Sequence, residues 1–340
     1  MKEYFIMEKL KKLNDICTIL FKEDDNYFEL SNAIDDLNQL FYETSKIDAG
    51  SNAAREDIYL PTGKAIGAFW AAMCVKEMMR TKQFIKGIYK GIKAAQERFE
   101  GEPIHVLYAG TGPFATLAVP FTSLFSPREI NFTFLEINPE SIRLLNNVIN
   151  TLNIKNYINE IVLCDAAEYK YNKSKPIHML ITETMLNALQ KEPQVAITMN
   201  LVPQMLKDGI LIPQNIRIEA ALLNPKKDNY RMAGAKDYDG KCYQIIDTVF
   251  DFNKETARQS CGTFPEMELD IPDNIEAGYN ELCLLTNIQI FDNVYLANWQ
   301  CSLNLPKRIM QLKQDASPIN KVSFQYILNK SPGFNFKVVS

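Results

Sequence analysis

The chain has 340 residues, of which 46% are hydrophobic and 23% are charged, and its formal net charge is −4. This composition is ordinary for a globular protein, and the length is sufficient for a large core or for two domains. No block of lysine and arginine stands out, so we expect neither a nucleic-acid partner nor attachment to an anionic membrane surface.

Cysteine and histidine usage limits the chemistry further. The seven cysteines are scattered and form no Cys-x-x-Cys pair, which fits reduced thiols in a cytoplasm better than a disulfide framework or a zinc site. His105 and His178 are the only histidines, and each follows Pro-Ile at the start of an apolar run, so we predict that both are structural. The sequence has no signal peptide pattern and no run of about 18 apolar residues, so we predict a cytoplasmic protein without a membrane span.

The N-terminal third reads as helical. Apolar residues recur at three- and four-residue steps over residues 1 to 48, with a charged break at KEDDN, and we predict that residues 1–58 form a helical extension. Residues 49 to 61 read as a connector, and a helix that is unbroken or broken once is expected from residue 62 to about 99. Phe69, Trp70 and Met73 lie on its apolar stripe and are expected to pack in the core.

From residue 104 to about 212, apolar runs alternate with helical stretches. The runs IHVLYA, INFTFLEI, EIVLCDA and HMLITE read as strands, and helices are expected after the glycine turn GTGPF, after Asn138 and in EPQVAITMNLVPQML. Continuously apolar strands that alternate with helices indicate a parallel sheet covered on both faces. The segment DGILIPQNIRIEAALL then reads as a turn plus a long strand. We predict that residues 59–223 form a Rossmann-like cofactor-binding domain.

The helical signal nearly disappears beyond residue 223. NPKKDNYRMAGAKDYDGK reads as a polar loop, and short β-type runs follow it, the last two joined by the turn sequence NKSPG. We predict that residues 224–340 form an antiparallel β-barrel or sandwich. The expected fold class is therefore α/β, with a helical N-terminal region and a β-rich C-terminal domain.

Three strand ends carry residues suited to a nucleoside. Gly110 and Gly112 follow the first strand, where glycine either makes a tight strand–helix turn or lets the backbone approach a ligand. Glu136 ends the second strand and can accept both hydroxyls of a ribose, or it can cap the helix that starts after Asn138. Asp165 ends the third strand and either reaches an adenine edge or belongs to a turn.

The glycine turn favours a cofactor without phosphates. Dinucleotide sites have a third glycine where this chain has Ala115, and Pro113 removes a backbone N–H from the place where a pyrophosphate needs donors. S-adenosylmethionine, which combines adenosine with a sulfonium and an amino-acid tail, is such a cofactor.

Two acids flank the segment that follows the fourth strand. Glu183 comes directly after the buried run IHMLIT, and Glu192 follows nine residues later, just before Pro193. Two convergent carboxylates without a cation would repel each other, and one would tend to take up a proton. The pair therefore either lies in a solvated loop or faces one cationic ligand, and Glu192 taken alone also fits a helix start, where the helix dipole favours an acid.

The segments VLYAGTGPF, FLEINPESI and VLCDAAEY and the acid pair together resemble the class I S-adenosylmethionine-dependent methyltransferases, and among them the protein arginine methyltransferase family. The resemblance extends over residues 70 to 223, is weak beyond them and is absent from residues 1 to 58. It implies a double-E loop in which Glu183 and Glu192 are catalytic and hold the acceptor. It also implies that Arg80 of KEMMRTKQF contacts the cofactor. The other cofactor contacts that it implies are Tyr108, Gly110, Gly112, Glu136, Asp165 and Ala166, and it implies no metal site.

Two positions depart from the family pattern. The Thr-His-Trp element that lines the family's acceptor pocket has its nearest match in Ala297-Asn298-Trp299, which lacks the histidine, and this puts the acceptor in doubt. The acid that many class I enzymes keep on the first strand is Tyr108 here. Tyr59 and Trp299 either line the acceptor pocket or only pack.

The sequence thus predicts methyl transfer from S-adenosylmethionine to a nitrogen, preferably a guanidino or amine nitrogen of free arginine, a peptide or a protein. One alternative is a natural-product O- or N-methyltransferase in which the acids bind an amine or act as general base. Another is a cofactor-binding scaffold without turnover. The resemblance implies a possible homodimer, for which the loop at 224–241 and the N-terminal helices are both candidate arms.

Overall fold

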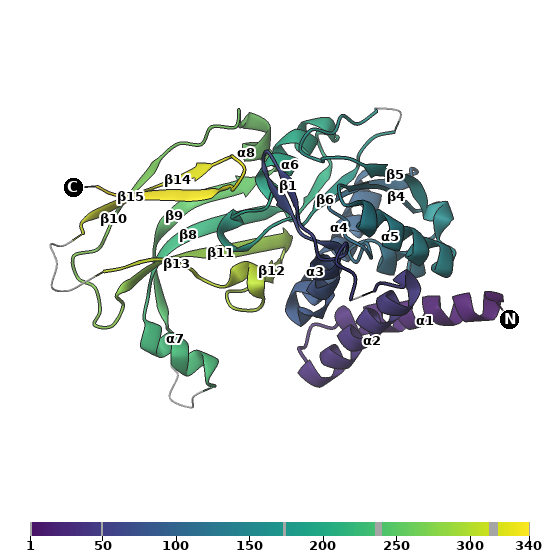
Figure 1. Ribbon diagram of the computed structural model, residues 1–340, viewed down its shortest axis with the longest axis horizontal. Coiled ribbons are helices and arrows are strands. Elements are labelled where there is room, and N and C mark those ends of the chain that lie inside the picture. The colour runs from purple at the N-terminus through teal and green to yellow at the C-terminus, as the bar shows by residue number, and fades with distance from the viewer. Residues whose placement is uncertain (1, 49, 173–174, 235–239, 313–318, 340) are drawn as a thin grey trace.

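The fold is described from a computed structural model that covers residues 2–48, 50–172, 175–234, 240–312 and 319–339. The chain forms two halves that lie side by side (Figure 1). The N-terminal helices and a parallel sheet make up one half, and antiparallel strands make up the other. The short strand β1 lies where the two halves meet.

The predicted N-terminal helices are present as α1 (Lys2–Leu20) and α2 (Tyr27–Ser45). Their apolar stripes bury Leu13, Leu37 and Phe41, and Asn26 caps α2 through a side-chain oxygen that accepts from the Glu29 N–H. The two helices contact each other, and α2 also packs against α5 (Pro139–Leu152). No helix among the described residues combines the length and hydropathy that a membrane crossing requires.

The charged break between α1 and α2 is fastened to the helix α4 (Met78–Arg98). The side chain of Lys82 is only 1% exposed, and its ammonium donates to the Asp24 carbonyl at 3.1 Å and to the Asp25 carboxylate at 2.6 Å. One helical turn further, Lys86 donates to Glu23 at 2.6 Å. A buried ammonium is costly unless it is paired and hydrogen-bonded, so these contacts fix the N-terminal helices on α4.

The region before α4 departs from the expected helix. Residues 58–65 form a hairpin of β1 (Ile58–Leu60) and β2 (Gly63–Ala65), and helix begins only with α3 (Ala68–Met73) and η1 (Cys74–Lys76). Gly63 has φ +140°, a conformation outside the helical region. The prediction of helix from residue 62 is therefore wrong over its first six residues.

The parallel sheet confirms the predicted α/β core. Its strands lie in the order β5-β4-β3-β6-β7 and all pair in parallel. They are β3 (Ile104–Ala109), β4 (Ile130–Glu136), β5 (Ile158–Leu163), β6 (Met179–Thr182) and β7 (Ile210–Ile212). Every residue of β3, β6 and β7 is buried. Because successive side chains point to opposite faces, these strands are covered on both faces. The intervening helices are η3 (Lys155–Tyr157), η4 (Asn187–Leu189), α6 (Gln194–Leu201) and η5 (Val202–Gln204), in addition to α5.

The helix predicted directly after the glycine turn is absent. Residues 111–118 form turns, and only the short η2 (Val119–Ser123) follows. Gly112 and Ala115 both have left-handed backbones, with φ +60° and +43°, so a right-handed helix cannot start there. Consequently the glycine turn does not lead directly into a helix. The other predicted helix start is confirmed, because the side chain of Asn138 caps α5.

The C-terminal half contains two antiparallel sheets, as the β-type runs predict. One has the order β12-β11-β8-β9 with β13 also paired to β11, and the other has the order β10-β14-β15. Their strands are β8 (Asn215–Leu223), β9 (Tyr243–Asn253), β10 (Met267–Asp270), β11 (Glu281–Phe291), β12 (Val294–Leu296), β13 (Lys307–Gln311), β14 (Lys321–Ile327) and β15 (Gly333–Val339). The aromatic rings of Phe250, Phe264, Tyr326 and Phe334 pack against one another between these sheets. NKSPG joins β14 to β15 as a hairpin connection.

Two helices occur where the sequence predicts none. The polar stretch after residue 223 begins with α7 (Pro225–Met232), capped by Asn224, and α8 (Lys254–Gln259) follows β9. The rest of that stretch at 235–239 lies outside the described residues. Strand β8 pairs with β9 and β11, so it belongs to the C-terminal sheet, whereas the predicted boundary at 223 groups it with the core.

Candidate active site

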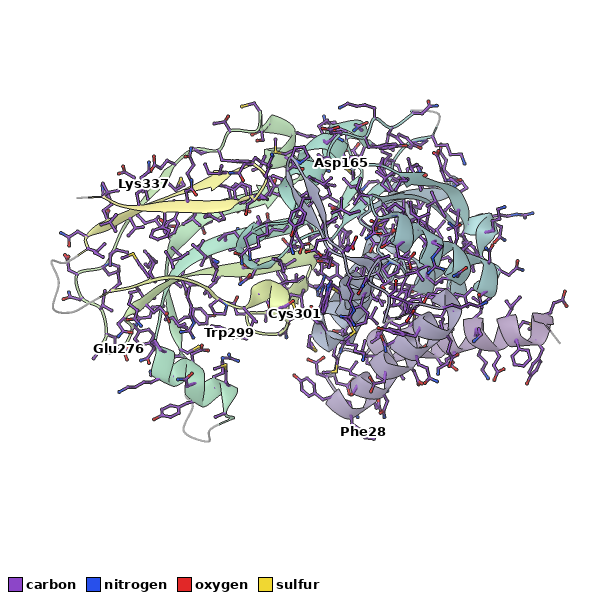
Figure 2. The ribbon with its side chains drawn as sticks, viewed as in Figure 1. Phe28, Asp165, Glu276, Trp299, Cys301 and Lys337 are labelled. Atoms are coloured by element: carbon purple, nitrogen blue, oxygen red, sulfur yellow. The ribbon has the colours of Figure 1, made fainter. Side chains whose placement is uncertain are left out.

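A cavity of about 360 Å³ lies over the carboxyl ends of the parallel strands, where the two halves meet. Its wall contains the residues at the ends of β3, β4, β5 and β6, together with parts of the β1–β2 hairpin, α3 and α4, and Ser302 from the C-terminal half. Asp165 and Cys301, which immediately precedes Ser302, are labelled on the two sides of this junction (Figure 2). The carboxyl edge of an open α/β sheet is where ligands bind, and the volume suits a small molecule.

The glycine turn forms part of the cavity wall. Gly110 has φ +74°, and a Cβ placed there would lie 2.2 Å from the Thr184 side chain. Gly112 has φ +60°, and a Cβ there would lie 3.3 Å from Ala71. Glycine is therefore required at position 110 for two reasons, its positive φ and the closeness of Thr184, which follows β6. The two glycines bring backbone to the cavity, and Thr111 lines it between them.

Glu136 is buried at the end of β4 and lines the cavity. Its Oε1 accepts the N–H groups of Ile137 and Asn138 at 2.9 Å each, and its Oε2 accepts the Gly112 N–H at 2.7 Å. The Thr111 hydroxyl donates to Oε2 over a longer 3.4 Å. Burial raises the pKa of this carboxyl above its ordinary value, and these donors counteract the rise. Glu136 thus organises the turn and the start of α5 while it faces the cavity.

The remaining strand-end residues also reach the cavity. Asp165 and Ala166 line it after β5, and the Asp165 Oδ1 accepts the Ala167 N–H at 2.8 Å, so this acid does belong to a turn. Tyr108 is buried on β3 and lines the cavity, and burial holds the pKa of its hydroxyl well above the ordinary value. All predicted cofactor residues therefore share one cavity.

Arg80, on the first turn of α4, lies between two carboxylates. Its Nη1 donates to Glu77 at 2.7 Å and its Nη2 donates to Glu183 at 2.5 Å. The guanidinium is nearly buried, with its side chain 11% exposed. Burial opposes the charged form, but the two carboxylates overcome it and hold the pKa of Arg80 well above its ordinary value. The arginine and the first acid of the pair are thus in direct contact.

Glu183 has one carboxylate oxygen in use and one without a partner. Oε2 accepts from Arg80, whereas the buried Oε1 has no hydrogen-bond partner among the described residues. Burial raises the pKa of Glu183 above its ordinary value, although Arg80 counteracts the rise. A buried acceptor that is left unsatisfied is costly in a folded protein, so this oxygen indicates a place for a donor from outside the chain.

Glu192 lines the same cavity and is only 6% exposed. Burial and the nearby Glu183 raise its pKa from 4.5 to about 7, against the opposing effects of Arg80 and Lys64. The helix-start alternative finds no support in the contacts, since α6 begins two residues later and none of its described N–H groups donates to this carboxylate. The two acids therefore interact electrostatically in one cavity.

The loop between the acids is held by the C-terminal half. Ala188, Leu189 and Lys191 all have positive φ, between 52° and 67°, a conformation that costs non-glycine residues on the order of 1 kcal/mol each. Hydrogen bonds to the C-terminal half hold it, among them those from the Ala188 N–H to Thr286 Oγ1 (2.8 Å), from the Tyr326 hydroxyl to the Leu189 carbonyl (2.9 Å) and from the Lys191 N–H to the Pro332 carbonyl (2.7 Å). The C-terminal half thus fixes the strained loop that carries Glu192.

Sequence reasoning missed two residues that shape the cavity. Gln194 is fully buried, its Oε1 accepts the Thr184 N–H at 2.9 Å, and its Nε2 donates to the Thr182 carbonyl at 3.1 Å. It thereby ties α6 to the segment that carries Glu183. Ser302 enters from the C-terminal half. Neither residue has a sequence signal, because a glutamine at a helix start and a serine in a loop usually face solvent.

The two predicted acceptor-pocket aromatics do not reach the cavity. Tyr59 is 78% exposed on the β1–β2 hairpin. Trp299 stacks on Tyr243, with ring centroids 5.1 Å apart, and Arg231 of α7 lies 4.8 Å from its ring; Figure 2 labels Trp299 on the α7 side of its loop. Trp70 and Met73, in contrast, line the cavity instead of packing in the core, because α3 is short and lies at the cavity wall.

The histidines form a buried network at the other edge of the sheet. The His105 N–H donates to Nδ1 of His178 at 3.0 Å, and the His105 ring contacts Thr133 Oγ1 and the Pro176 carbonyl at 2.9 and 2.8 Å. Burial lowers the pKa of His105 to about 4. Both rings lie at the amino ends of strands, away from the cavity, and their contacts are structural.

Comparisons with known proteins identify the fold. No family model matches the sequence, and no curated protein matches it. Among solved structures, a chain of the Trypanosoma brucei PRMT1 enzyme–prozyme heterotetrameric complex with AdoHcy is similar, with a TM-score of 0.52 and 11% identity over 79% of this chain and 92% of that chain. Arabidopsis thaliana protein arginine methyltransferase 10, in a uniquely open conformation, gives a TM-score of 0.48 and 11% identity over 73% of this chain and 84% of that chain. The chain therefore has the fold of the Trypanosoma PRMT1 chain, a parallel α/β core followed by an antiparallel β half.

Proposed function

We propose that this chain is an S-adenosylmethionine-dependent methyltransferase that methylates a guanidino or other amine nitrogen. The observation that carries the proposal is the unpartnered Oε1 of Glu183, which is buried in a cavity that also holds Glu192 and Arg80. Burying a carboxylate oxygen without a donor is costly. A ligand with N–H donors and a positive charge would compensate that cost, and a protonated amine or guanidinium has both.

The cavity residues fit the proposed cofactor. Arg80 uses two of its five N–H groups on Glu77 and Glu183, so donors remain for the carboxylate of a methionine moiety. At Glu136, a ribose hydroxyl could replace the long Thr111 contact, and Asp165, which lines the same cavity, would face the adenine. S-adenosylmethionine, when bound, supplies a methyl group made electrophilic by its sulfonium. The AdoHcy named with the Trypanosoma complex is consistent with this proposal.

The acid pair suits a cationic acceptor. A guanidinium keeps its charge at all ordinary pH values and spreads its lone pairs over three nitrogens. Glu183 and Glu192 can each accept an N–H of such a group through charge-assisted hydrogen bonds. Held in this way, one nitrogen is oriented toward the cofactor end of the cavity. The rate gain then comes from positioning and electrostatics.

Glu192 is suited to take up the released proton. In the transfer a carbon–nitrogen bond forms, the carbon–sulfur bond breaks with its electron pair going to sulfur, and the nitrogen loses one proton. A carboxylate with a pKa near 7 is a suitable acceptor for that proton at neutral pH. Glu183, whose Oε2 accepts from Arg80, orients the acceptor.

Two measurements test the proposal. Calorimetry with S-adenosylmethionine and with its demethylated product is expected to show binding of both, and a screen of free arginine, arginine peptides and small amines is expected to show a gain of one methyl mass. If neither nucleoside binds, or if no amine or guanidine gains a methyl group, the proposal is wrong.

Two arginine variants test whether the demethylated cofactor product binds in this cavity. Arg80→Ala is expected to weaken the demethylated product's binding by roughly 100-fold, the effect of losing a charged hydrogen-bonding partner. Arg308 is a matched control, because it bridges Asp228 and Glu281 outside the cavity as Arg80 bridges two acids within it. Arg308→Ala should leave the affinity unchanged.

A further inference from the structure

Ser302, from the C-terminal half, lines the cavity and donates to the carboxylate of Glu77. Its N–H donates to Oε1 of Glu77 at 2.8 Å, and its hydroxyl donates to Oε2 at 3.0 Å. One residue therefore satisfies both oxygens of one carboxylate, although 225 positions separate Ser302 from Glu77. Two donors from one residue fix the orientation of the carboxylate more tightly than one would.

Glu77 passes this restraint on to Arg80. It lies half-buried immediately before α4 and accepts Nη1 of Arg80 at 2.7 Å, while Nη2 of the same arginine donates to Glu183. Burial acts to raise the pKa of Glu77, but Arg80 and the two Ser302 donors more than offset it, so the pKa lies below its ordinary value. Ser302, Glu77, Arg80 and Glu183 thus form a continuous hydrogen-bonded chain from the C-terminal half to the acid loop.

A buried asparagine holds the loop that presents Ser302. Asn304 has no exposed surface, and its side-chain oxygen accepts the Cys301 N–H at 3.0 Å. Its amide nitrogen donates to the Ala297 carbonyl, and its carbonyl accepts the Trp299 N–H at 3.2 Å. Trp299 in turn has φ +65°, a left-handed conformation that persists only where neighbours impose it. The loop is therefore shaped independently of the cavity and presents Ser302 from a fixed position.

The same loop also touches the acid loop directly. The side-chain amide of Asn187, between the two acids, donates to the Leu305 carbonyl at 2.9 Å. Residues 302–305 therefore contact both the start of α4 and the segment that carries Glu183 and Glu192. A shift of this loop would move the arginine and the acids together.

We propose that Ser302 is a positioning residue that sets Arg80 and Glu183 through Glu77, and so aligns the acceptor end of the cavity with its cofactor end. This inference rests on the proposed function and adds a positioning residue to its site. The hydroxyl of Ser302 acts on alignment more than on cofactor binding, because Arg80 keeps its charge and its donors without it. Its removal is therefore expected to lower kcat while the affinity for the cofactor changes little.

A readout that needs no catalysis tests the hydrogen-bonded chain. In cofactor-free protein labelled with ¹⁵N-arginine, the Arg80 side-chain signals, assigned by their loss in Arg80→Lys, should be resolved because two carboxylates restrain the guanidinium. Ser302→Ala should shift or broaden them, and Ser302→Thr, which keeps the hydroxyl, should restore them. Unchanged Arg80 signals in Ser302→Ala would overturn the inference, whatever the chain catalyses.

Kinetics with whichever acceptor the methyl-transfer screen identifies provide the second readout. Ser302→Ala is expected to lower kcat roughly tenfold, the effect of losing one hydrogen bond to a charged group, with the KM for S-adenosylmethionine within twofold of the unaltered chain. Ser302→Thr should recover most of kcat. If Ser302→Ala matches the unaltered chain in kcat, or if threonine fails as alanine does, the hydroxyl has no positioning role.

Ser323 supplies the matched control. It is a buried serine of the same half whose hydroxyl also donates to a glutamate, Glu266, but it lies outside the cavity. Ser323→Ala should leave both the Arg80 signals and kcat unchanged; an equal loss in this variant would show a general packing effect and overturn the inference. If the unaltered chain binds no cofactor, the proposed function fails, and the arginine signals still decide whether Ser302 restrains Arg80.

Discussion

The carboxylates at the two ends of the cavity differ in their hydrogen-bond partners and in their pKa values. One end is formed by the tips of β4 and β5 and is called the strand-tip end below. There Glu136 accepts three backbone N–H groups and Asp165 accepts one. At the other end, formed by the loop 183–192 and called the loop end below, Glu183 has a buried oxygen with no partner in the described part of the chain, and Glu192 has a pKa raised to about 7. The first end is complete before any ligand arrives. The second keeps two buried carboxylates whose raised pKa values a cationic ligand would lower.

The largest expected effect is at the loop end. Glu183→Gln removes the negative charge that faces the acceptor and should lower kcat/KM for methyl transfer on the order of 1,000-fold, the upper range for one electrostatic group. The affinity for the demethylated cofactor product, measured by calorimetry, should change by less than about threefold.

Glu281→Gln is the matched control for this change, since Glu281 is another buried glutamate paired with an arginine, Arg308. It should leave kcat/KM unaltered. Activity of Glu183→Gln within tenfold of the unaltered chain would mean that the two ends of the cavity do not differ in the way described.

The raised pKa of Glu192 should make the free energy of unfolding depend on pH. Its folded pKa of about 7 lies above the ordinary 4.5. As the pH rises from 4.5 to 7, the unfolded chain therefore gives up its proton first and the folded state loses stability, by up to about 3 kcal/mol. Glu192→Gln cannot ionise, so it should be more stable than the unaltered chain at pH 8 and equal to it at pH 4.

Urea unfolding at both pH values measures this difference, with the exposed Glu100→Gln as control. Asp57, Lys64, Arg80 and Glu183 are the charged groups that act on Glu192. If Glu192→Gln were stabilised equally at pH 4 and pH 8, the raised pKa of Glu192 would be contradicted.

At the strand-tip end the expected effect is smaller. In Glu136→Gln one oxygen becomes an NH₂ group, so either the Gly112 N–H or the Ile137 and Asn138 N–H groups face a donor. The loss should be about 1–3 kcal/mol of unfolding free energy, with roughly tenfold weaker binding of the demethylated cofactor product. Unaltered stability on urea unfolding would show that the strand-tip end is not held by these hydrogen bonds.

Tyr59 should matter least. Its exposed ring lies outside the cavity wall, so Tyr59→Ala should keep kcat and KM within twofold in a methyl-transfer assay. Trp70→Ala is the informative partner variant, because Trp70 lines the cavity from α3 and its removal should raise KM. A large loss in Tyr59→Ala alone would place the β1–β2 hairpin over the acceptor during turnover.

The strands and their terminal acids could be predicted because local pattern and sheet geometry agree. Each strand of the parallel sheet is an apolar run, and the carboxyl ends of parallel strands meet at one edge, so Gly110, Glu136, Asp165 and Glu183 had to lie close together. The apolar periodicity of the first 48 residues likewise predicted both N-terminal helices.

What could not be predicted depends on conformations and contacts without a local signal. The helix after the glycine turn fails because Ala115 adopts a left-handed backbone that alanine does not signal. Ser302 and Gln194 act through contacts set by tertiary structure, which residue type alone does not indicate. Trp299 was a candidate because Ala297-Asn298-Trp299 is the nearest match to a family motif, and the sequence left both Tyr59 and Trp299 open between lining a pocket and packing, because residue type does not specify a position in space.

The buried ammonium of Lys82 makes the N-terminal helices inseparable from the rest of the chain. Its partners, Asp24 and Asp25, lie between α1 and α2, while Lys82 itself lies two residues after Arg80 on α4. A chain shortened to begin after Ser45 would lose both hydrogen-bond partners of this ammonium, together with the apolar surface that α1 and α2 bury. The arginine of the cavity is thus carried by a helix whose packing and buried ammonium depend on contacts from α1, α2 and the segment between them.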